Sequence, residues 1–484
     1  MQLDILPVAV PGERWAGHLS VLQATVARHA QAASPEAALQ ARRLLLDTLG
    51  CAIAGRHAPE VMRLETILAR LEPGAWRFPG GPPLTMASAT QVLATAATWD
   101  EACEGHALAH GRPGVALIAA LLPLALQGGA SLRHFVDAFV LGYEVGARAG
   151  AWLRVRPGMH VDANWPSIGV AAGVAGLLGL PPAGILQAIN IAACQLATSL
   201  YLPVATGCTA RNTYLAHSAL LGSQAAFASA AGMDAPPDAL AHYANDHAAA
   251  SAQDMPPATK TLLLSAYIKP FAAVRHVHYG AVAAARIRER LAGATQGIEA
   301  LTLTVYPEAA VYCGNRAPRT PIQAQFSLSF GVAAMLRFGE LDPSVYAADR
   351  FDDAELRRLE ALVVVHTDEA LFQSSGPSGP SGRGATLDVE HTGGPLHEQV
   401  GVIAGDPGQA LDRGALCAKF RRYTARDLLD KRALLFCNTL LDVPDIDLAA
   451  LWQRIAPVKP ASSRRGNAST ADIDSATHLI PGLK

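Results

Sequence analysis

The sequence predicts a mainly α-helical protein whose helical body is interrupted by an α+β segment. Residues 20–268 are rich in Ala and Leu at helical spacing, with few clusters of β-branched residues. Residues 269–405 contain three stretches with the composition of strands, and helical spacing returns from about residue 408. Since 484 residues exceed the size at which one hydrophobic core stops growing, we expect more than one domain.

The first part of the chain, residues 1–268, carries three signals of packed helices. Ser34 before Pro35 predicts a helix start, with serine as the N-cap and proline in the first turn. The longest apolar run, 115–126, is shorter than the roughly 20 residues that span a membrane, so it predicts a buried helix. The small residues of GVAAGVAGLLGL (169–180) predict helices that approach one another closely.

The second part, residues 269–405, carries the strand signals. The stretch IEALTLTVYPEA (298–309) alternates like a half-buried strand, and RGATLDVEHTGG (383–394) reads as a strand that ends in a glycine turn. Between them, ELRRLEALVVVHTDEAL (355–371) joins a helical pattern to a β-branched run. This part is therefore predicted to be an α+β domain.

The remaining segments complete this organisation. Residues 406–460 are predicted to form the second part of the helical domain. The first 15 or so residues are predicted to form an extended arm, and residues 373–384 a mobile loop because Gly, Ser and Pro dominate them. Residues 461–484 are predicted to be disordered.

Composition restricts the partners and the compartment. With 39 Lys and Arg against 41 Asp and Glu, the net charge of −2 offers no field for nucleic acid or an anionic membrane, so we expect neither as a partner. A small molecule or another subunit is favoured. The seven cysteines contain no CxxC pair, which argues against a disulfide framework or a structural zinc site and favours a cytoplasmic protein. The first residues lack the basic region and long apolar run of a signal peptide.

A first polar cluster, residues 100–112, directly precedes the apolar run. It contains Asp100, Glu101, Glu104, His106, His110 and Arg112. On a helix, the two histidines would share a face at the i, i+4 spacing, which is also a metal-ligand spacing. The HExxH order is absent, so no metal is expected. The alternative interpretation is a solvated loop before a core helix, because ionisable residues beside an apolar run mark a site only statistically.

Three further clusters adjoin apolar sequence. His160 and Asp162 precede a helix expected near Pro166, whose N-terminus suits a carboxylate; the alternative is a loop capped by Asn164. Arg211, Tyr214 and His217 open another apolar helix. There Arg211 is either a bidentate carboxylate clamp or a surface arginine.

The fourth cluster contains Lys269, Arg275, His276 and His278 at the junction of the two parts, where ligand clefts are common. The alternative is a linker with solvated charges. Together the four clusters supply basic and imidazole groups with one strong acid candidate, Asp100, and no nucleophilic Ser or Cys in a recognisable elbow. Such a pocket suits proton abstraction next to a carboxylate.

At these same residues the sequence resembles the MmgE/PrpD family, which contains 2-methylcitrate dehydratases, cis-aconitate decarboxylases and an iminodisuccinate epimerase. The resemblance rests on the order and spacing of seven segments: LLLDTLGCAIAG (44–55), the Asp-His-PG block (100–114), MHVDANWPSIGVAAGVAGLLGL (159–180), RNTYLAHSALLGSQAAFASAAGM (211–233), KPFAAVRHVHYGAVAA (269–284), PIQAQFSLSFGVA (321–333) and GDPGQALDRGALCAKF (405–420). It implies a large all-α domain built from both ends of the chain, an inserted smaller α+β lid domain and a homodimer. It also implies a site between body and lid that uses no metal or cofactor and acts on small di- or tricarboxylic acids.

Residue roles follow from the resemblance position by position. Asp100 and His110 match the acid and histidine of the family's "DFDD…HP" block, His160 matches the histidine of "HxTGtwG", and Lys269 and His278 match the ends of "KpyPxcRxxH". The expected catalytic residues are therefore Asp100, His110, His160 and His278. The expected substrate-binding residues are His106, Arg211, Tyr214, Lys269 and Arg275.

The chain also departs from the family pattern. "DFDD" is here WDEAC, and Arg211 replaces the lysine of "KRLHxGrAA", with Tyr214 and His217 in place of its histidine and arginine. Arginine keeps its proton, so it can bind a carboxylate but cannot shuttle protons as a lysine can. The leading hypothesis is a lyase that dehydrates a hydroxy di- or tricarboxylic acid such as 2-methylcitrate. An epimerase, isomerase or decarboxylase of a related acid, or an inactive carboxylate-binding homologue, is the alternative.

Overall fold

A computed structural model of the chain describes residues 13–29, 32–246, 249, 254–372, 383–406 and 408–455. Across these residues the fold is mainly α, as predicted, with twenty α-helices and two small sheets. The predicted N-terminal arm, most of the predicted loop 373–384 and the predicted disordered tail lie outside the described residues. Within the described part, no helix is both long enough and apolar enough to cross a membrane.

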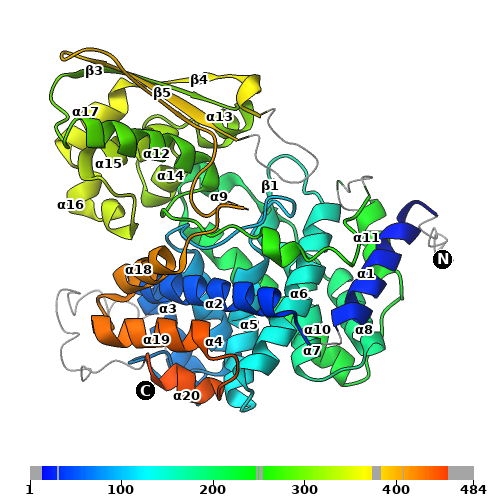
Figure 1. Ribbon diagram of the computed structural model, residues 1–484. Helices are drawn as coiled ribbons and strands as arrows, with labels where there is room; N and C mark the ends of the chain where they lie inside the picture. Colours follow the sequence, from blue (N-terminus) through cyan, green and yellow to red (C-terminus); the bar gives the residue numbers. More distant parts are fainter. Residues whose placement is uncertain are drawn as a thin grey trace, which may run out of the picture.

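Helices from the first half of the chain form most of the helical body, seen in blue to green in Figure 1. They are α1 (Ala16–His29), α2 (Pro35–Gly55), α3 (Pro59–Leu71), α4 (Met86–Thr98), α5 (Pro113–Gln127), α6 (Leu132–Trp152), α7 (Pro166–Leu177), α8 (Pro182–Ala193), α9 (Leu202–Thr206), α10 (Tyr214–Ala230) and α11 (Ala239–Asp246). Two short strands, β1 (Met159–His160) and β2 (Ser199–Leu200), pair antiparallel between them.

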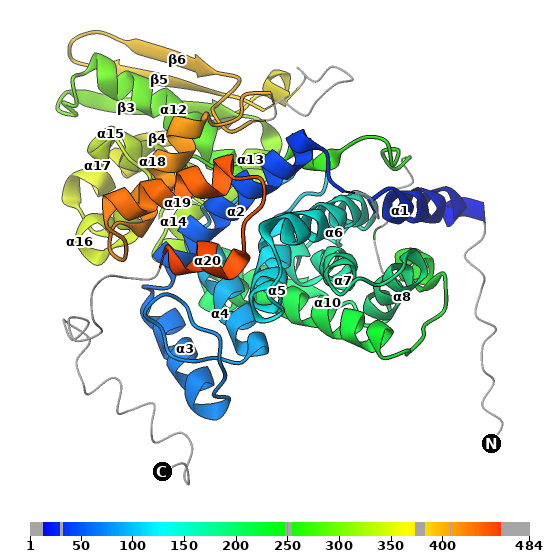
Figure 2. The same cartoon turned by 60° about the horizontal axis from the view of Figure 1, so that its bottom comes forward.

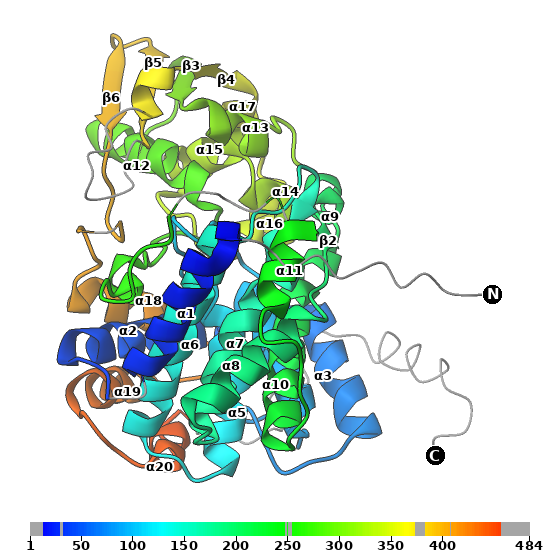
Figure 3. The same ribbon diagram turned by 90° about the vertical axis from the view of Figure 1, so that its right-hand side faces the viewer.

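Local sequence explains how these helices begin and pack. The Ser34 hydroxyl accepts a hydrogen bond from the Ala37 N–H at 3.3 Å, and Pro35 opens α2, which confirms the predicted cap. The predicted buried helix is α5, and α5, α6, α7 and α10 lie side by side in the middle of the body (Figure 3). A Cβ on Gly169 of α7 would lie 2.7 Å from the Gly142 carbonyl oxygen of α6. Only glycine permits this approach, which confirms the packing role predicted for the small residues.

The α+β segment is built around a four-stranded sheet in the order β4-β3-β5-β6. Its elements are α12 (Arg275–Arg290), β3 (Ile298–Val305), α13 (Pro307–Cys313), α14 (Pro321–Gln325), α15 (Leu328–Phe338), α16 (Ala348–Phe351), α17 (Ala354–Leu362), β4 (Val363–Thr367), β5 (Ala385–His391) and β6 (Leu396–Val400). β3 pairs parallel with β4 and antiparallel with β5, which pairs antiparallel with β6. In Figure 1, α12, α15 and α17 lie between the sheet and the body.

The chain then returns to the helical body with α18 (Arg413–Thr424), α19 (Asp430–Asp442) and α20 (Leu448–Gln453). α18 packs against α2, and both appear together in Figure 2. The contact is close because Gly50 of α2 lies under Phe420 of α18. Segments from the two ends of the chain therefore share one hydrophobic core.

Candidate functional site

A cavity of about 360 Å³ lies where the helical body meets the α+β segment. Its walls come from loops at residues 101–112 and 150–162, from Tyr201 and Arg211, from residues 267–276 and from the first helix after β3. Six cationic side chains line it, and we call them the cavity cations: Arg112, Arg154, Arg211, Lys269, Arg275 and Arg383. Three carboxylates line it as well: Glu101, Asp162 and Glu308.

The Glu101 carboxylate is the centre of the inner wall. Its Oε1 lies 2.5 Å from Lys269 Nζ, and its Oε2 lies 2.6 Å from Arg211 Nη2 and 3.1 Å from Arg112 Nη1. Burial alone would raise the pKa of Glu101, but the three cations hold that pKa well below its usual value. Arg112 also pairs with Asp162, so the inner wall is a continuous ionic network.

The loop that carries Glu101 is held by backbone bridges. Gly105 and Tyr267 exchange hydrogen bonds of 3.0 and 2.9 Å, which joins the loop to the segment leading to Lys269. A side chain at position 105 would collide with the Tyr267 ring, because a Cβ would lie 2.3 Å from its hydroxyl oxygen. His106 completes the join, since its Nε2 donates to the Leu262 carbonyl at 3.0 Å.

Helix α6 also holds the segment before Lys269, through hydrogen bonds to residues 260–263. Glu144 accepts hydrogen bonds from the Leu262 and Leu263 N–H groups at 3.0 and 2.8 Å, and Arg148 donates to the Lys260 carbonyl at 2.8 Å. Glu144 and Arg148 form a fully buried ion pair at the i, i+4 spacing. The segment before Lys269 is therefore anchored to the body by side chains of one helix.

Lys419 of α18 supports the inner wall from the opposite end of the chain. Its Nζ lies 2.5 Å from Asp47 Oδ1, 2.7 Å from the Ala102 carbonyl and 2.8 Å from the Lys269 carbonyl. This buried ammonium thus holds the backbone on both sides of the Glu101–Lys269 contact. No sequence pattern singled out Lys419 as a site residue.

The histidines at positions 106 and 110 differ in how their rings are used. They lie in a loop of turns rather than on a helix, so the conditional helical interpretation of this stretch is wrong. In addition to its bond to Leu262, His106 accepts the Ala109 N–H on Nδ1 at 3.4 Å, so backbone groups occupy both of its ring nitrogens. It lines the cavity but serves to shape the loop. Burial lowers its pKa to about 4.

His110 lines the cavity and differs from His106 in its backbone and in its ring contacts. Its backbone has φ 53°, a left-handed conformation that is uncommon for a residue with a side chain. Among the described residues, neither of its ring nitrogens has a hydrogen-bond partner. Loss of water around the ring, together with the charges of Arg154 and Arg383, lowers the pKa of His110 to about 4. The ring is therefore neutral near pH 7, and its lowered pKa makes it a weaker base than an ordinary histidine until a bound anion offsets the charges of Arg154 and Arg383.

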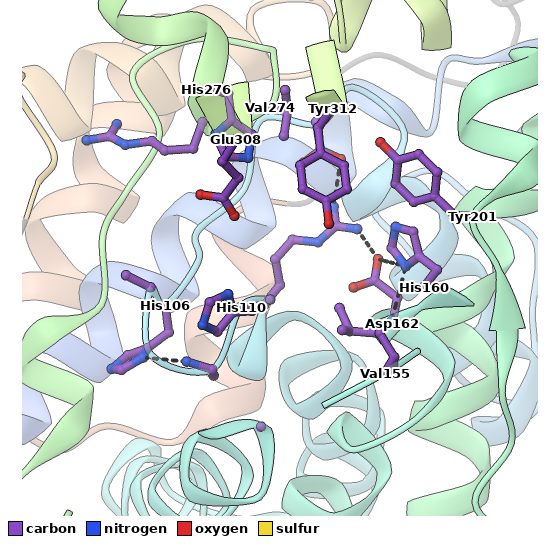
Figure 4. A pocket seen from close by; sticks show the side chains of 18 of the residues that line it. His106, His110, Val155, His160, Asp162, Tyr201, Val274, His276, Glu308 and Tyr312 are labelled. Carbon is purple, nitrogen blue, oxygen red and sulfur yellow. Dashed lines mark hydrogen bonds and ion pairs between the residues drawn. The ribbon is translucent and has the colours of Figure 1, made fainter. Parts of the chain in front are cut away.

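His160 is held in one tautomer. Its Nδ1 accepts the Asp162 N–H at 3.2 Å, which leaves the ring proton on Nε2. The ring stacks on Tyr201 at 6.0 Å and meets Tyr214 edge-on at 5.6 Å. Burial lowers the pKa of His160 to about 4, so near pH 7 it is a neutral hydrogen-bond donor. Figure 4 shows His110 and His160 on two sides of the cavity, with Glu308 and Tyr312 above it.

Arg211, Lys269 and Arg275 line the cavity, and all three are buried. The alternative interpretations of Arg211 as a surface arginine and of Lys269 and Arg275 as solvated linker charges are therefore wrong. Arg275 pairs with Asp406 and lies over the rings of Tyr267 and Tyr279.

Three expected site residues do not line the cavity. Asp100 is half-buried outside it, and loss of solvation raises its pKa to about 7. His278 is buried on α12 itself, and its Nε2 donates to the Ala273 carbonyl at 2.9 Å. Tyr214 lies behind His160 and donates its hydroxyl hydrogen to the Leu200 carbonyl at 3.0 Å.

Asn164 is not the N-cap of α7, so the alternative interpretation of this loop is wrong. α7 begins at Pro166 without a side-chain cap, and the Asn164 amide donates to the Ala197 carbonyl and the Tyr243 hydroxyl at 2.6 and 2.7 Å.

The cavity also contains residues to which the sequence assigned no role. Glu101, Arg112, Asp162 and His276 belong to the recognised clusters, and their charge or ring beside apolar sequence was the available signal. Five others gave no sequence signal: Arg154, Tyr201, Glu308, Tyr312 and Arg383. Among the residues that the structure describes, no group of three or more His, Cys, Asp or Glu side chains is arranged to hold a metal ion.

Comparison with family models gives two matches that together span most of the chain. The MmgE/PrpD N-terminal domain matches residues 23–255, and the MmgE/PrpD C-terminal domain matches residues 271–436. A comparison with curated proteins found no match. The boundary between the two matched domains falls at the segment that carries Tyr267 and Lys269, which is part of the cavity wall.

Proposed function

Because the chain belongs to the MmgE/PrpD family, a family of dehydratases and related enzymes, we propose that it is a lyase that dehydrates a small hydroxy di- or tricarboxylic acid. The observation that carries this proposal is the composition of the cavity. Six cations line a space that also contains the neutral rings of His110 and His160. The His160 ring accepts a hydrogen bond from a backbone N–H on Nδ1, whereas the His110 ring has no partner among the described residues. Cations suit substrate carboxylates, and a neutral imidazole suits proton abstraction.

In the proposed reaction, Arg383 and Arg275, whose Nη1 has no hydrogen-bond partner among the described residues, hold the carboxylate next to the carbon that loses its proton. Negative charge builds up on that carboxylate as the C–H bond breaks, and buried cations stabilise it. His110 accepts the proton because its ring is neutral and unpartnered among the described residues. No metal or other cofactor is assigned a role in the proposal.

The second half of the reaction breaks the C–O bond and forms the C=C bond. The leaving hydroxide takes the proton that His110 has just accepted, which releases water and restores the neutral imidazole. His160 donates a hydrogen bond from Nε2 to the leaving oxygen. It keeps its own proton, because its Nδ1 already accepts the Asp162 N–H and cannot take up a replacement.

The test is a turnover assay on purified protein with 2-methylcitrate, citrate and malate, following formation of the unsaturated acid. His110→Gln should lower kcat by about 10²- to 10⁴-fold, the usual contribution of a general base, with a smaller change in KM. His217→Gln is the matched control, because His217 is an exposed histidine of α10 outside the cavity. The proposal fails if the wild type removes water from none of these acids while a known family dehydratase does so in the same assay.

An epimerase or isomerase is the second candidate, and the position of Asp100 favours it. Asp100 was the one strong acid candidate among the expected catalytic residues, and it does not line the cavity. Epimerisation needs two proton-transfer groups and no leaving group, and His110 and Glu308 both face the space (Figure 4). Solvent deuterium that enters the substrate α-position without loss of water would identify this reaction. Tight binding without turnover, altered by His110→Ala only in affinity, would instead identify an inactive carboxylate-binding homologue.

A homodimer is part of the same proposal. Leu200, Leu202 and Val311 are exposed beside Tyr201 and Tyr312, whose rings are 5.7 Å apart at the cavity wall. Apolar side chains gathered in this way suit coverage by a second subunit. Size-exclusion chromatography with light scattering should give twice the chain mass, and Leu202→Asp should lower it toward the monomer.

A further inference from the structure

The inner wall of the cavity already holds a carboxylate that belongs to the protein. Glu101 places one oxygen 2.5 Å from Lys269 Nζ and the other 2.6 Å from Arg211 Nη2, with Arg112 Nη1 at 3.1 Å. These are the distances of charge-assisted hydrogen bonds, and a substrate carboxylate would use the same three donors in the same way. Glu101 therefore takes up the binding capacity of three of the six cavity cations.

The Glu101 side chain is fixed at this position. Its backbone has φ 52°, which turns the residue into the wall, and the Lys269 ammonium also donates to its backbone carbonyl at 2.9 Å. The side chain is about 5% exposed. Displacing it would leave a buried carboxylate without partners, which is strongly unfavourable.

The charges around the cavity leave a surplus of two. Six cations line it, and four carboxylates compensate them: Glu101, Asp162 and Glu308 in the wall, and Asp406, which pairs with Arg275. The four lining histidines are neutral near pH 7, since burial lowers the pKa of His276 to about 3 and that of the other three to about 4. A ligand with two negative charges neutralises this surplus, and a third negative charge exceeds it.

We propose that Glu101 is a specificity-determining residue that limits the substrate to two carboxylates. It occupies the place between Lys269, Arg211 and Arg112 where a third substrate carboxylate would bind, and it repels a carboxylate brought next to it. The cavity volume of about 360 Å³ lies within the usual range for small-ligand sites, so the limit is electrostatic rather than steric. The inference rests on the proposed function only in that the same cavity binds the substrate. It ranks hydroxy dicarboxylic acids above 2-methylcitrate.

The test compares two unreactive probes that differ by one carboxylate, glutarate and tricarballylate. Their dissociation constants are measured by isothermal titration calorimetry at about pH 7.5, where all the carboxylates of both probes are ionised. The wild type should bind glutarate at least tenfold more tightly, a difference of about 1.4 kcal/mol. Glu101→Gln keeps the shape, frees Lys269 and Arg211 from a negative charge and should reverse the preference.

Glu104→Gln is the matched control. Glu104 lies in the same loop, is equally buried and does not line the cavity. Burial raises its pKa to about 8, so it is already largely neutral and its substitution changes the charge little. This variant should keep the preference of the wild type for glutarate.

The outcomes separate this inference from the proposed reaction. A wild type that prefers tricarballylate, or a folded Glu101→Gln protein with unchanged preference, overturns the inference, whatever acids the enzyme dehydrates. A reversed preference in a protein that dehydrates no acid supports the inference and refutes the lyase. If Glu101→Gln does not fold, the preference of the wild type together with that of Glu101→Asp decides, because aspartate keeps the charge and should keep the preference for glutarate.

Discussion

Lys419 supports the site without lining it, and its loss should be costly. Its ammonium is buried against Asp47 Oδ1 at 2.5 Å and against the Ala102 and Lys269 carbonyls at 2.7 and 2.8 Å. Lys419→Met removes the charge and leaves Asp47 as a buried carboxylate without a counterion. Breaking a buried ion pair in this way costs about 3–5 kcal/mol of unfolding free energy. The Ala102 and Lys269 carbonyls also lose their hydrogen-bond donor, which adds to the cost in unfolding free energy.

The pH dependence of the variant follows from the same geometry. Burial already raises the pKa of Asp47, and Lys419 opposes that shift, so without Lys419 the folded-state pKa rises further. A carboxyl group whose pKa is raised on folding contributes stability that is fully present below its unfolded pKa of about 3.9 and is lost as the pH rises through the folded pKa. The loss of stability in Lys419→Met should therefore be larger at pH 8 than at pH 5.

Urea unfolding gives the change in stability, and amide hydrogen exchange locates it, because a protein of this size need not unfold in one step. Exchange should increase in residues 100–106 and 266–270, the two segments that Lys419 joins. The double variant Asp47→Leu, Lys419→Met should regain at least half of the lost stability, since an apolar pair leaves no buried charge. A loss below about 1 kcal/mol in the single variant, or a double variant no more stable than the single one, would refute the reasoning.

Three further predictions follow from the same structure. Gly105→Ala should cost about 1–3 kcal/mol of unfolding free energy, and Tyr267→Ala in the same chain should restore part of it, because the Tyr267 ring occupies the space that a Cβ needs. Burial lowers the pKa of His106 and His160 from 6.5 to about 4, so stability should be constant above pH 6.5 and fall between pH 6.5 and about 4, where the unfolded chain binds protons that the folded protein does not. His106→Asn should flatten this profile in urea titrations. Ser34→Ala should cost about 1 kcal/mol in thermal unfolding, and an unchanged midpoint would contradict the cap.

Much of the fold could be predicted because its signals are local. Ser34 and Pro35 fix the start of α2 through one hydrogen bond and one ring constraint, and both act within a single turn. The alternation in residues 298–305 and the β-branched run at 363–367 predicted β3 and β4 for the same reason. The order of strands in the sheet depends on contacts between distant segments, and no local pattern indicates it.

For the site residues, local sequence patterns do not predict which of two neighbouring side chains lines the cavity. Asp100 and Glu101 are adjacent carboxylates that follow Trp99, the C-cap of α4. The left-handed backbone at Glu101 turns this residue toward the cavity and leaves Asp100 outside it, and no sequence pattern indicates that turn. His276 and His278 stand two positions apart on α12, a spacing at which side chains do not share a face. His276 lines the cavity, and His278 is buried without lining it. Sequence spacing separates the members of each pair, but it does not say which one faces the ligand.

Counting basic residues in a sequence overestimates the positive charge that a ligand meets. Arg211, Lys269 and Arg275 suggested an open set of carboxylate binders, yet Glu101 engages the first two and Asp406 the third. Those partners lie 110, 168 and 131 residues away along the chain, so no window of sequence contains both members of a pair. The charge available to a substrate is the surplus that remains after internal pairing. Because that surplus is two here, the number of carboxylates on the substrate depends on Glu101 as much as on the arginines and lysine around it.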